Sequence, residues 1–280
     1  MAIDPNCTLG GKLLSIHDDQ IETKLCPEVL ALKDKLLENI MDSKAWLNYA
    51  VSLSDYHWIN RDAVNAISLA IAIDPFVAEY HFFRGYCHQK LGLLQESVAD
   101  FEMAWKLDGN HVNAAYYLGM SYFYMGEYER AYRAYQGLYR ISPPDAEWAA
   151  NANWMYLTCM KLGKKEEAQK ALEPITPEST PTQSVGTLGN VWDDAYYLMA
   201  CQMYHGWVAP EEQLRRAKEK DEDTYRALLM FVALYYDVNG DLEKAREYYQ
   251  KELDFLGGKV TTSSKWMIGP RLAELNKILG

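Results

Sequence analysis

The sequence lacks long apolar runs, and it lacks a recognisable leader. Its longest apolar stretch, ALLMFVALYY at residues 227–236, has ten residues, about half of what a helix needs to cross a bilayer. No basic segment followed by an apolar core stands at the beginning, so no secretion signal is predicted. We expect no direct membrane insertion and, as the sequence stands, a cytoplasmic location. A periplasmic or lipid-anchored protein would need a signal that is not in this sequence.

Basic residues are also scarce. The chain has 28 Lys and Arg against 39 Asp and Glu, for a net charge of -11. Phosphate backbones repel such a chain unless it concentrates its basic residues in a patch. The densest basic runs, at 161–165 and 215–220, are short and lie among or beside acidic residues. We therefore predict that nucleic acid is not a partner.

Cysteine pairs and catalytic motifs are missing as well. The five cysteines include no CxxC pair, which favours reduced, core-packed thiols over a disulfide framework or a zinc site. The sequence contains no GxSxG, HExxH, GxGxxG or GxxxxGK[ST] motif. His81 and His88 share one predicted helix, and we expect them to pack or hydrogen-bond between helices. We predict no catalytic residues, no metal site and no cofactor.

An internal repeat accounts for most of the chain. One copy carries Leu118, Gly119, Tyr122, Gly126, Ala131 and Tyr135, and a step of 34 residues backward meets Arg84, Gly85, His88, Gly92, Ser97 and Phe101. A second such step reaches residues 50–67, and further copies surround Gly163, Gly206 and Gly240. Each copy reads as an apolar helix, a turn that usually contains glycine, and a second helix with a small anchoring residue. The copy around Gly206 is degenerate, and its second helix should begin at Pro210.

This period and these residue types resemble the tetratricopeptide repeat (TPR). The resemblance implies an all-α, right-handed superhelical solenoid of about six helix-turn-helix repeats with a capping helix at each end. We divide the chain into an N-terminal extension and cap (1–43), repeats 1–4 (44–173), a loop rich in Pro, Thr and Ser (174–190), repeats 5–6 (191–253) and a C-terminal cap (254–280).

The layout resembles, more narrowly, the bacterial NlpI-type TPR lipoproteins over residues 62–275. The matching segments are FVAEYHFFRGYCHQKLGLLQESVADFEMAWKLD, GWVAPEEQLRRAKEK and ALYYDVNGDLEKAREYYQ. That resemblance implies a non-enzymatic adaptor, often dimeric, that holds hydrolases or proteases near their substrates. The chain departs from the family in its lipoprotein signal, because Cys7 is not preceded by a lipobox. Membrane anchoring is therefore not carried over.

Aromatic residues gather on the first helices of the repeats. The segment AAYYLGMSYFYM at 114–125 has no charged residue, so such a helix must be covered on both sides. One side belongs to the repeat core, and in a TPR-like array the other points to the concave surface. That register predicts a groove that binds a peptide or partner segment, lined by Phe82, Tyr86, Tyr116, Met120, Phe123, Asn153, Leu157, Tyr196 and Met203.

Other interpretations of this lining stay open at the level of sequence. Tight curvature could bury it against neighbouring helices, or tyrosine hydroxyls and Asn153 could form the pocket of an enzyme or small-molecule binder. Self-association as a homodimer is a further alternative, as is a chaperone for secreted proteins. We favour a protein-interaction adaptor whose partner is another protein or peptide.

Overall fold

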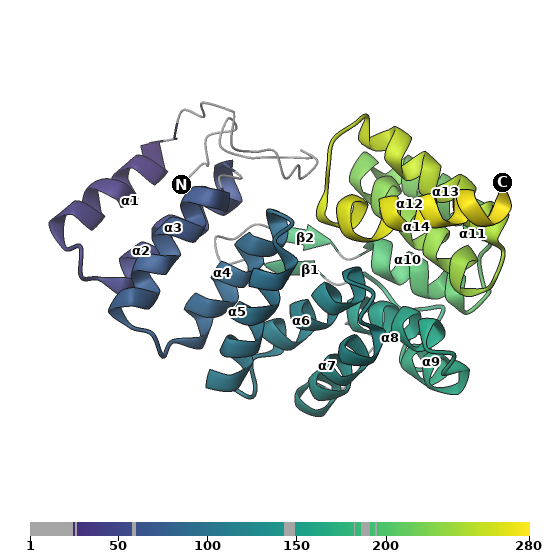
Figure 1. The fold of residues 1–280 in the computed structure, drawn as a ribbon, viewed down its shortest axis with the longest axis horizontal. Coiled ribbons are helices and arrows are strands. Elements are labelled where there is room, and N and C mark those ends of the chain that lie inside the picture. The colour runs from purple at the N-terminus through teal and green to yellow at the C-terminus, as the bar shows by residue number, and fades with distance from the viewer. Residues whose placement is uncertain are drawn as a thin grey trace. The chain divides into compact units, whose positions relative to one another are not determined.

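The protein folds into helical hairpins that follow one another along the chain (Figure 1). The computed structural model describes residue 25 and residues 27–57, 60–142, 149–181, 183–185, 191–193 and 195–280. These ranges contain the six predicted helix-turn-helix copies, with a further helix at each end. The predicted all-α TPR architecture is thereby confirmed.

The chain divides into two compact units. Unit 1 comprises residues 1–121 with Val260–Thr262, and unit 2 comprises residues 122–259 with 263–280. The division falls within one helix rather than at the 174–190 loop. The helices of unit 1 are α1 (Pro27–Glu38), α2 (Ser43–His57), α3 (Asn60–Ile73), α4 (Ala78–Lys90), α5 (Leu94–Leu107) and most of α6 (Val112–Tyr124). In it, α2 packs on α3 and α4 packs on α5.

Unit 2 contains the remaining repeats and the C-terminal cap. Its elements are α7 (Tyr128–Ile141), α8 (Ala149–Lys161), α9 (Lys165–Leu172), α10 (Ala195–Tyr204), α11 (Pro210–Lys220), α12 (Glu222–Val238), α13 (Leu242–Leu256), the short π-helix η2 (Ser264–Ile268) and α14 (Gly269–Leu279). Helix α11 begins at Pro210, as predicted. In this unit α8 contacts α10 and α12 as well as its hairpin partner α9.

A short antiparallel ladder interrupts the helices. Strands β1 (Gln183–Val185) and β2 (Val191–Asp193) pair with Ser184 opposite Trp192. Strand β1 lies in the predicted 174–190 loop and β2 at the start of the predicted fifth repeat. No strand is expected in either place, because no run of alternating polar and apolar residues is long enough to indicate one.

Each turn between paired helices follows one plan from the second repeat to the sixth. A glycine with positive φ ends the first helix at Gly92, Gly126, Gly163, Gly206 and Gly240. At Gly126, the amide of Glu127 donates to the Tyr122 carbonyl at 2.9 Å and the Gly126 amide donates to the Phe123 carbonyl at 3.0 Å. This pair of bonds defines a Schellman cap, whose left-handed residue is usually glycine. The repeated glycine of the sequence is therefore a backbone requirement.

Replacement of Gly126 by alanine should destabilise the fold through the backbone alone. A Cβ at Gly126 would meet nothing within 4 Å, but its φ of +75° is strained for an L-residue, at a cost of about 1 kcal/mol. Gly109 also has open space around a Cβ and has no positive φ. Urea unfolding should therefore show a lower free energy of unfolding for Gly126→Ala than for wild type, and almost no change for Gly109→Ala. Equal losses for both variants would contradict the assignment.

Candidate partner-binding faces

Three of the four predicted lining residues of unit 1, Phe82, Tyr86 and Tyr116, belong to an aromatic cluster built by α4, α5 and α6. Phe82 is 8% exposed, and its ring centroid lies 5.0 Å from His111, 5.8 Å from Tyr117 and 5.9 Å from Phe101. Tyr116 and Met120 on α6 are 8% and 7% exposed. Phe82, Tyr116 and Met120 are thus mostly covered, and each presents only a small part of its surface.

Tyr86 is the most accessible of the four predicted residues in unit 1. It lies one turn after Phe82 on α4 and is half-buried. Its ring packs edge-on against Tyr117 with centroids 5.3 Å apart, and Lys90 Nζ lies 4.2 Å from the ring centroid. Lys90 also donates a hydrogen bond to Ser54 Oγ at 3.2 Å. The tyrosine is thus fixed in place as a platform next to a cation.

Two exposed amides share the first helices of unit 1 with this platform. Asn48 on α2 stands 34 residues before Phe82 and so has the same place in the repeat, and Asn113 is the second residue of α6. Neither residue belongs to the predicted lining, which follows the register of the uncharged aromatic segment at 114–125. Amide side chains supply both a donor and an acceptor, which is what an extended main chain offers in return.

The predicted lining of unit 2 is different, because four of its five residues are core. Phe123 and Met203 are 1% exposed, and Asn153 and Leu157 are 0% exposed. Asn153 Oδ1 accepts a hydrogen bond from the Tyr204 hydroxyl at 2.9 Å, and Phe123 packs on Trp154 with centroids 5.3 Å apart. We therefore assign these four residues to the interior of unit 2 and not to an open groove.

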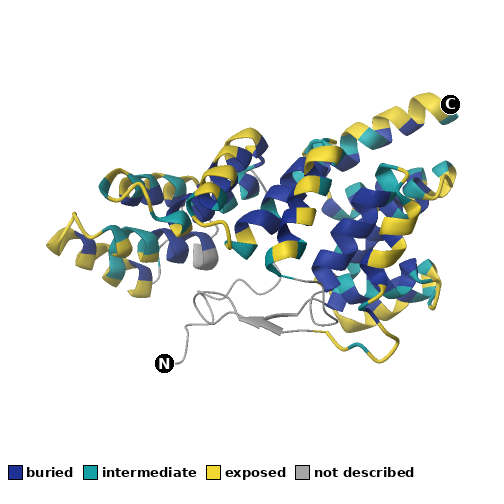
Figure 2. Ribbon diagram, turned by 90° about the horizontal axis from the view of Figure 1, so that it is seen from below, coloured by how far each residue is buried: buried dark blue, intermediate teal, exposed yellow. Residues whose placement is uncertain are grey.

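Close packing among first helices explains this burial (Figure 2). Helix α8 contacts both α10 and α12, and Trp154 of α8 lies 5.5 Å from Phe231 of α12. Every residue of α8 from Ala149 to Cys159 is buried. Apolar and aromatic side chains of neighbouring helices cover these residues, which agrees with the alternative in which the lining is buried. Tyr196 remains half-buried, with its ring 4.3 Å from that of Tyr197.

A buried ion cluster joins the same helices. The Asp237 side chain is 0% exposed and receives Lys161 Nζ at 2.7 Å and Arg271 Nη2 at 2.7 Å. The Tyr249 hydroxyl donates to its Oδ2 at 3.1 Å. Burial alone would raise the pKa of Asp237, but the Arg271 hydrogen bond and the Lys161 charge outweigh it and lower that pKa. The carboxylate thereby connects α8, α12, α13 and α14.

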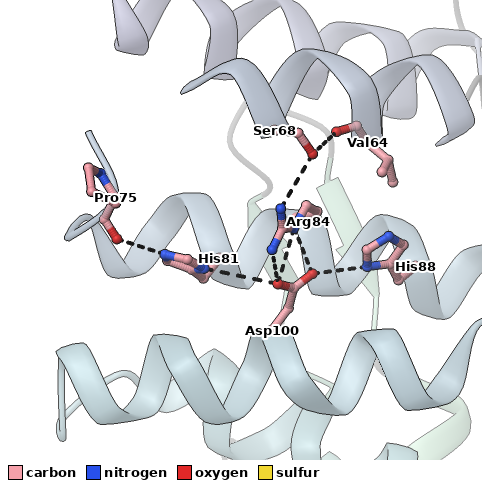
Figure 3. A network of polar contacts seen from close by, with 7 residues as sticks. All are labelled: Val64, Ser68, Pro75, His81, Arg84, His88 and Asp100. Carbon is pink, nitrogen blue, oxygen red and sulfur yellow. Dashed lines mark hydrogen bonds and ion pairs between the residues drawn. The ribbon is translucent and has the colours of Figure 1, made fainter. Parts of the chain in front are cut away.

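The two histidines of α4 take part in a second network (Figure 3). Asp100 of α5 accepts hydrogen bonds from Arg84 Nε at 2.9 Å and Nη2 at 2.6 Å, and it contacts His88 Nδ1 at 2.9 Å. His81 Nε2 lies 2.8 Å from the Pro75 carbonyl. The predicted bond between helices is present for His88, which contacts Asp100 of α5, whereas His81 is buried and bonds the turn between α3 and α4. Burial tends to raise the pKa of Asp100, and the bonds from His88 and Arg84 lower it overall.

The described residues contain no group of three or more His, Cys, Asp or Glu side chains that could hold a metal ion. A groove of about 680 Å³ has α13 and Asn276 of α14 as its walls, and it is lined mainly by charged residues of α13. None of the predicted aromatic residues lines it.

No membrane-spanning helix is found among the described residues, because none of their helices combines the necessary length with an apolar sequence.

Comparisons with known proteins agree with this architecture. A tetratricopeptide repeat protein from Parabacteroides merdae ATCC 43184 is similar over 89% of this chain and 91% of that chain, with 13% identity and a TM-score of 0.57. A chain of the APC/C hetero-tetramer Cut9-Hcn1 is similar over 89% of this chain and 46% of that chain, with 12% identity and a TM-score of 0.57. No protein-family model matches the sequence. At these identities the likenesses show the TPR fold alone.

Removal of the Asp237 charge should destabilise unit 2 strongly. Asp237→Asn leaves Lys161 and Arg271 without their shared counter-charge, and loss of one partner of a buried ion pair costs about 3 kcal/mol. Glu247→Gln on α13 breaks an exposed pair with Lys251, so it should cost less than about 0.5 kcal/mol. Guanidinium unfolding gives both values, and hydrogen exchange should locate the first loss in α12 and α14. Similar values for the two variants would contradict a central role for Asp237.

The same carboxylate sets an acid limit on stability. Because the pKa of Asp237 is lower in the folded than in the unfolded chain, its contribution is complete above the unfolded value of about 4. That contribution is lost as the pH falls through the folded value. The unfolding free energy of wild type should therefore fall below pH 4 more steeply than that of Asp237→Asn. Parallel curves for the two proteins would show that Asp237 does not contribute.

Proposed function

We propose that the protein is a scaffold that binds another protein. An extended segment of that partner lies on the surface of unit 1 around Tyr86, which we term its inner face. The observation that carries this proposal is Tyr86, a half-buried aromatic ring that Tyr117 and Lys90 hold in place. The exposed amides of Asn48 and Asn113 lie on the first helices before and after it. Aromatic residues fixed in this way supply binding energy at low entropic cost.

The partner segment should offer an apolar or aromatic side chain to Tyr86 and main-chain groups to the two amides. Phe82, Tyr116 and Met120 support apolar contact there, because each of them keeps a small exposed area. Tyr196 of unit 2 belongs to this proposal as a second, separate contact residue. Phe123, Asn153, Leu157 and Met203 are not part of it. Burial of apolar surface contributes roughly 25 cal/mol per Å² before the entropy of ordering the segment is subtracted.

The narrower likeness to NlpI-type adaptors enters here as a proposal as well. It agrees with a non-enzymatic binding role, and the similar chain of the Cut9-Hcn1 hetero-tetramer is an example of a chain of this fold within an assembly. Homodimer formation stays a prediction. The surface through which we would expect it is the exposed apolar side of α1 and its following turn, where Leu37 is 72% exposed and Met41 is 67% exposed. Sedimentation equilibrium of wild type and Leu37→Lys would test it.

Tyr86→Ala should weaken partner binding by about tenfold or more, since loss of a central aromatic contact typically costs more than about 1.4 kcal/mol. The partner is first captured from a lysate of the source organism with wild type. Its binding segment is then mapped with overlapping peptides, and affinities are measured for Tyr86→Ala and Asn48→Ala by calorimetry. Circular dichroism checks that each variant is folded.

The matched control is Phe76→Ala, which removes an aromatic ring from the turn between α3 and α4 that is 78% exposed. This variant should bind like wild type. Equal affinities for wild type and folded Tyr86→Ala would sink the proposal for the face of unit 1. The second helices of the repeats would then be the candidate binding surface.

A further inference from the structure

Glu252 stands at a repeat position that is apolar in three other copies. It follows the turn glycine Gly240 by twelve residues, and the same step from Gly92, Gly126 and Gly163 meets Ala104, Leu138 and Ile175. Those three side chains are 0%, 0% and 2% exposed, and Glu252 is 1% exposed. A carboxyl group therefore occupies a place where the fold buries an apolar residue, which carries a free-energy cost unless the group is hydrogen-bonded or paired.

The partner at hand is Arg226 of α12, and the two groups stop short of bonding. Arg226 Nη1 lies 3.9 Å from Glu252 Oε1, beyond hydrogen-bond distance. Glu252 Oε2 and Arg226 Nε are both buried, and neither has a hydrogen-bond partner among the residues that the structure describes. Buried polar atoms are almost always paired in native proteins. The acidic side chain of Glu252 and the basic side chain of Arg226 are therefore neighbours that each keep an unpaired buried atom. A small movement of either side chain would let the two groups bond.

Among the described residues of the elements packed against α13, Arg226 is the charged group that acts on Glu252. Helix α13 contacts α12, η2 and α14. Lys265 of η2 lies 5.5 Å from the Trp266 ring, and Arg271 of α14 pairs with Asp237 and Glu274. On α13 itself, Glu247 and Lys251 pair on the exposed side. Burial raises the pKa of Glu252 to about 7, and the charge of Arg226 lowers it only in part.

We propose that Glu252 and Arg226 form a proton-controlled switch between α12 and α13. With a proton on Glu252, the side chain is neutral and packs in the apolar position without a bond to Arg226. When the proton leaves to solvent, the buried carboxylate requires a counter-charge, and Arg226 moves the remaining distance to form a hydrogen-bonded ion pair. The α12–α13 hairpin thus has two packings, which the solution pH selects around neutrality.

The sign of the effect on stability follows from linkage. Because the pKa of Glu252 is higher in the folded than in the unfolded chain, the folded state binds more protons between about pH 4.5 and 7. Stability is therefore greater at acid pH within this window and falls as the pH rises through it. This direction is opposite to that of Asp100 and Asp237, whose contributions disappear only in stronger acid.

Carboxyl carbon NMR of the full chain labelled at glutamate tests the switch directly. One glutamate should titrate near pH 7 in wild type, and that titration should be absent in Glu252→Gln and shifted upward in Arg226→Gln. The thermal midpoint of wild type should fall between pH 5 and 8, with a flatter profile for Glu252→Gln. Glu243→Gln, an acid in the first turn of the same helix, is the matched control and should behave like wild type.

The proposal is overturned if all glutamates titrate near 4.5 in wild type, or if wild type and Glu252→Gln have the same pH profile. Should Glu252→Gln not fold, Glu252→Leu restores the apolar residue of the Gly126 copy and provides the same comparison. An unshifted titration in folded Arg226→Gln would also contradict it, because the arginine would then play no part.

Discussion

In each unit a buried aspartate meets cations or histidine from other helices. In unit 2, Asp237 binds Lys161 and Arg271, and so fixes α8 and the C-terminal α14 against α12. In unit 1, Asp100 binds Arg84 and contacts His88. A buried charge of this kind tolerates only geometries in which its partners are present. The inner packing of unit 2, and with it the burial of residues that a more open TPR array would expose, depends on this constraint.

The consequence for function is a difference between the units. The first helices of unit 2 pack against one another, and Asn153 lies in the core, where its Oδ1 accepts a hydrogen bond from the Tyr204 hydroxyl. In unit 1, Tyr86 keeps part of its surface, and Asn48 and Asn113 are exposed. The proposed partner segment therefore belongs to unit 1. A buried carboxyl group has a second effect in unit 2. The unpaired atoms of Glu252 and Arg226 give the α12–α13 hairpin two packings.

Periodicity made much of this fold predictable. The spacing of glycine and small residues predicts the hairpins, because each turn needs a left-handed residue such as Gly126 and each crossing needs a small one such as Ala131. Register also placed the lining residues on the first helices. It could not show which of them are covered, since burial of Phe123 and Met203 depends on how closely successive repeats approach. The ion pair of Lys161 with Asp237 joins residues 76 positions apart, and no local pattern indicates such a pair.

Methionine oxidation measures this difference in coverage most directly. Met103 is 41% exposed, while Met120 is 7% and Met203 is 1% exposed. After brief treatment of the folded protein with peroxide, mass spectrometry should find Met103 oxidised rapidly and Met203 protected until unfolding, with Met120 slow. Oxidation of Met203 at the rate of Met103 would show that the inner face of unit 2 is open to solvent, and would contradict the account of a closed face.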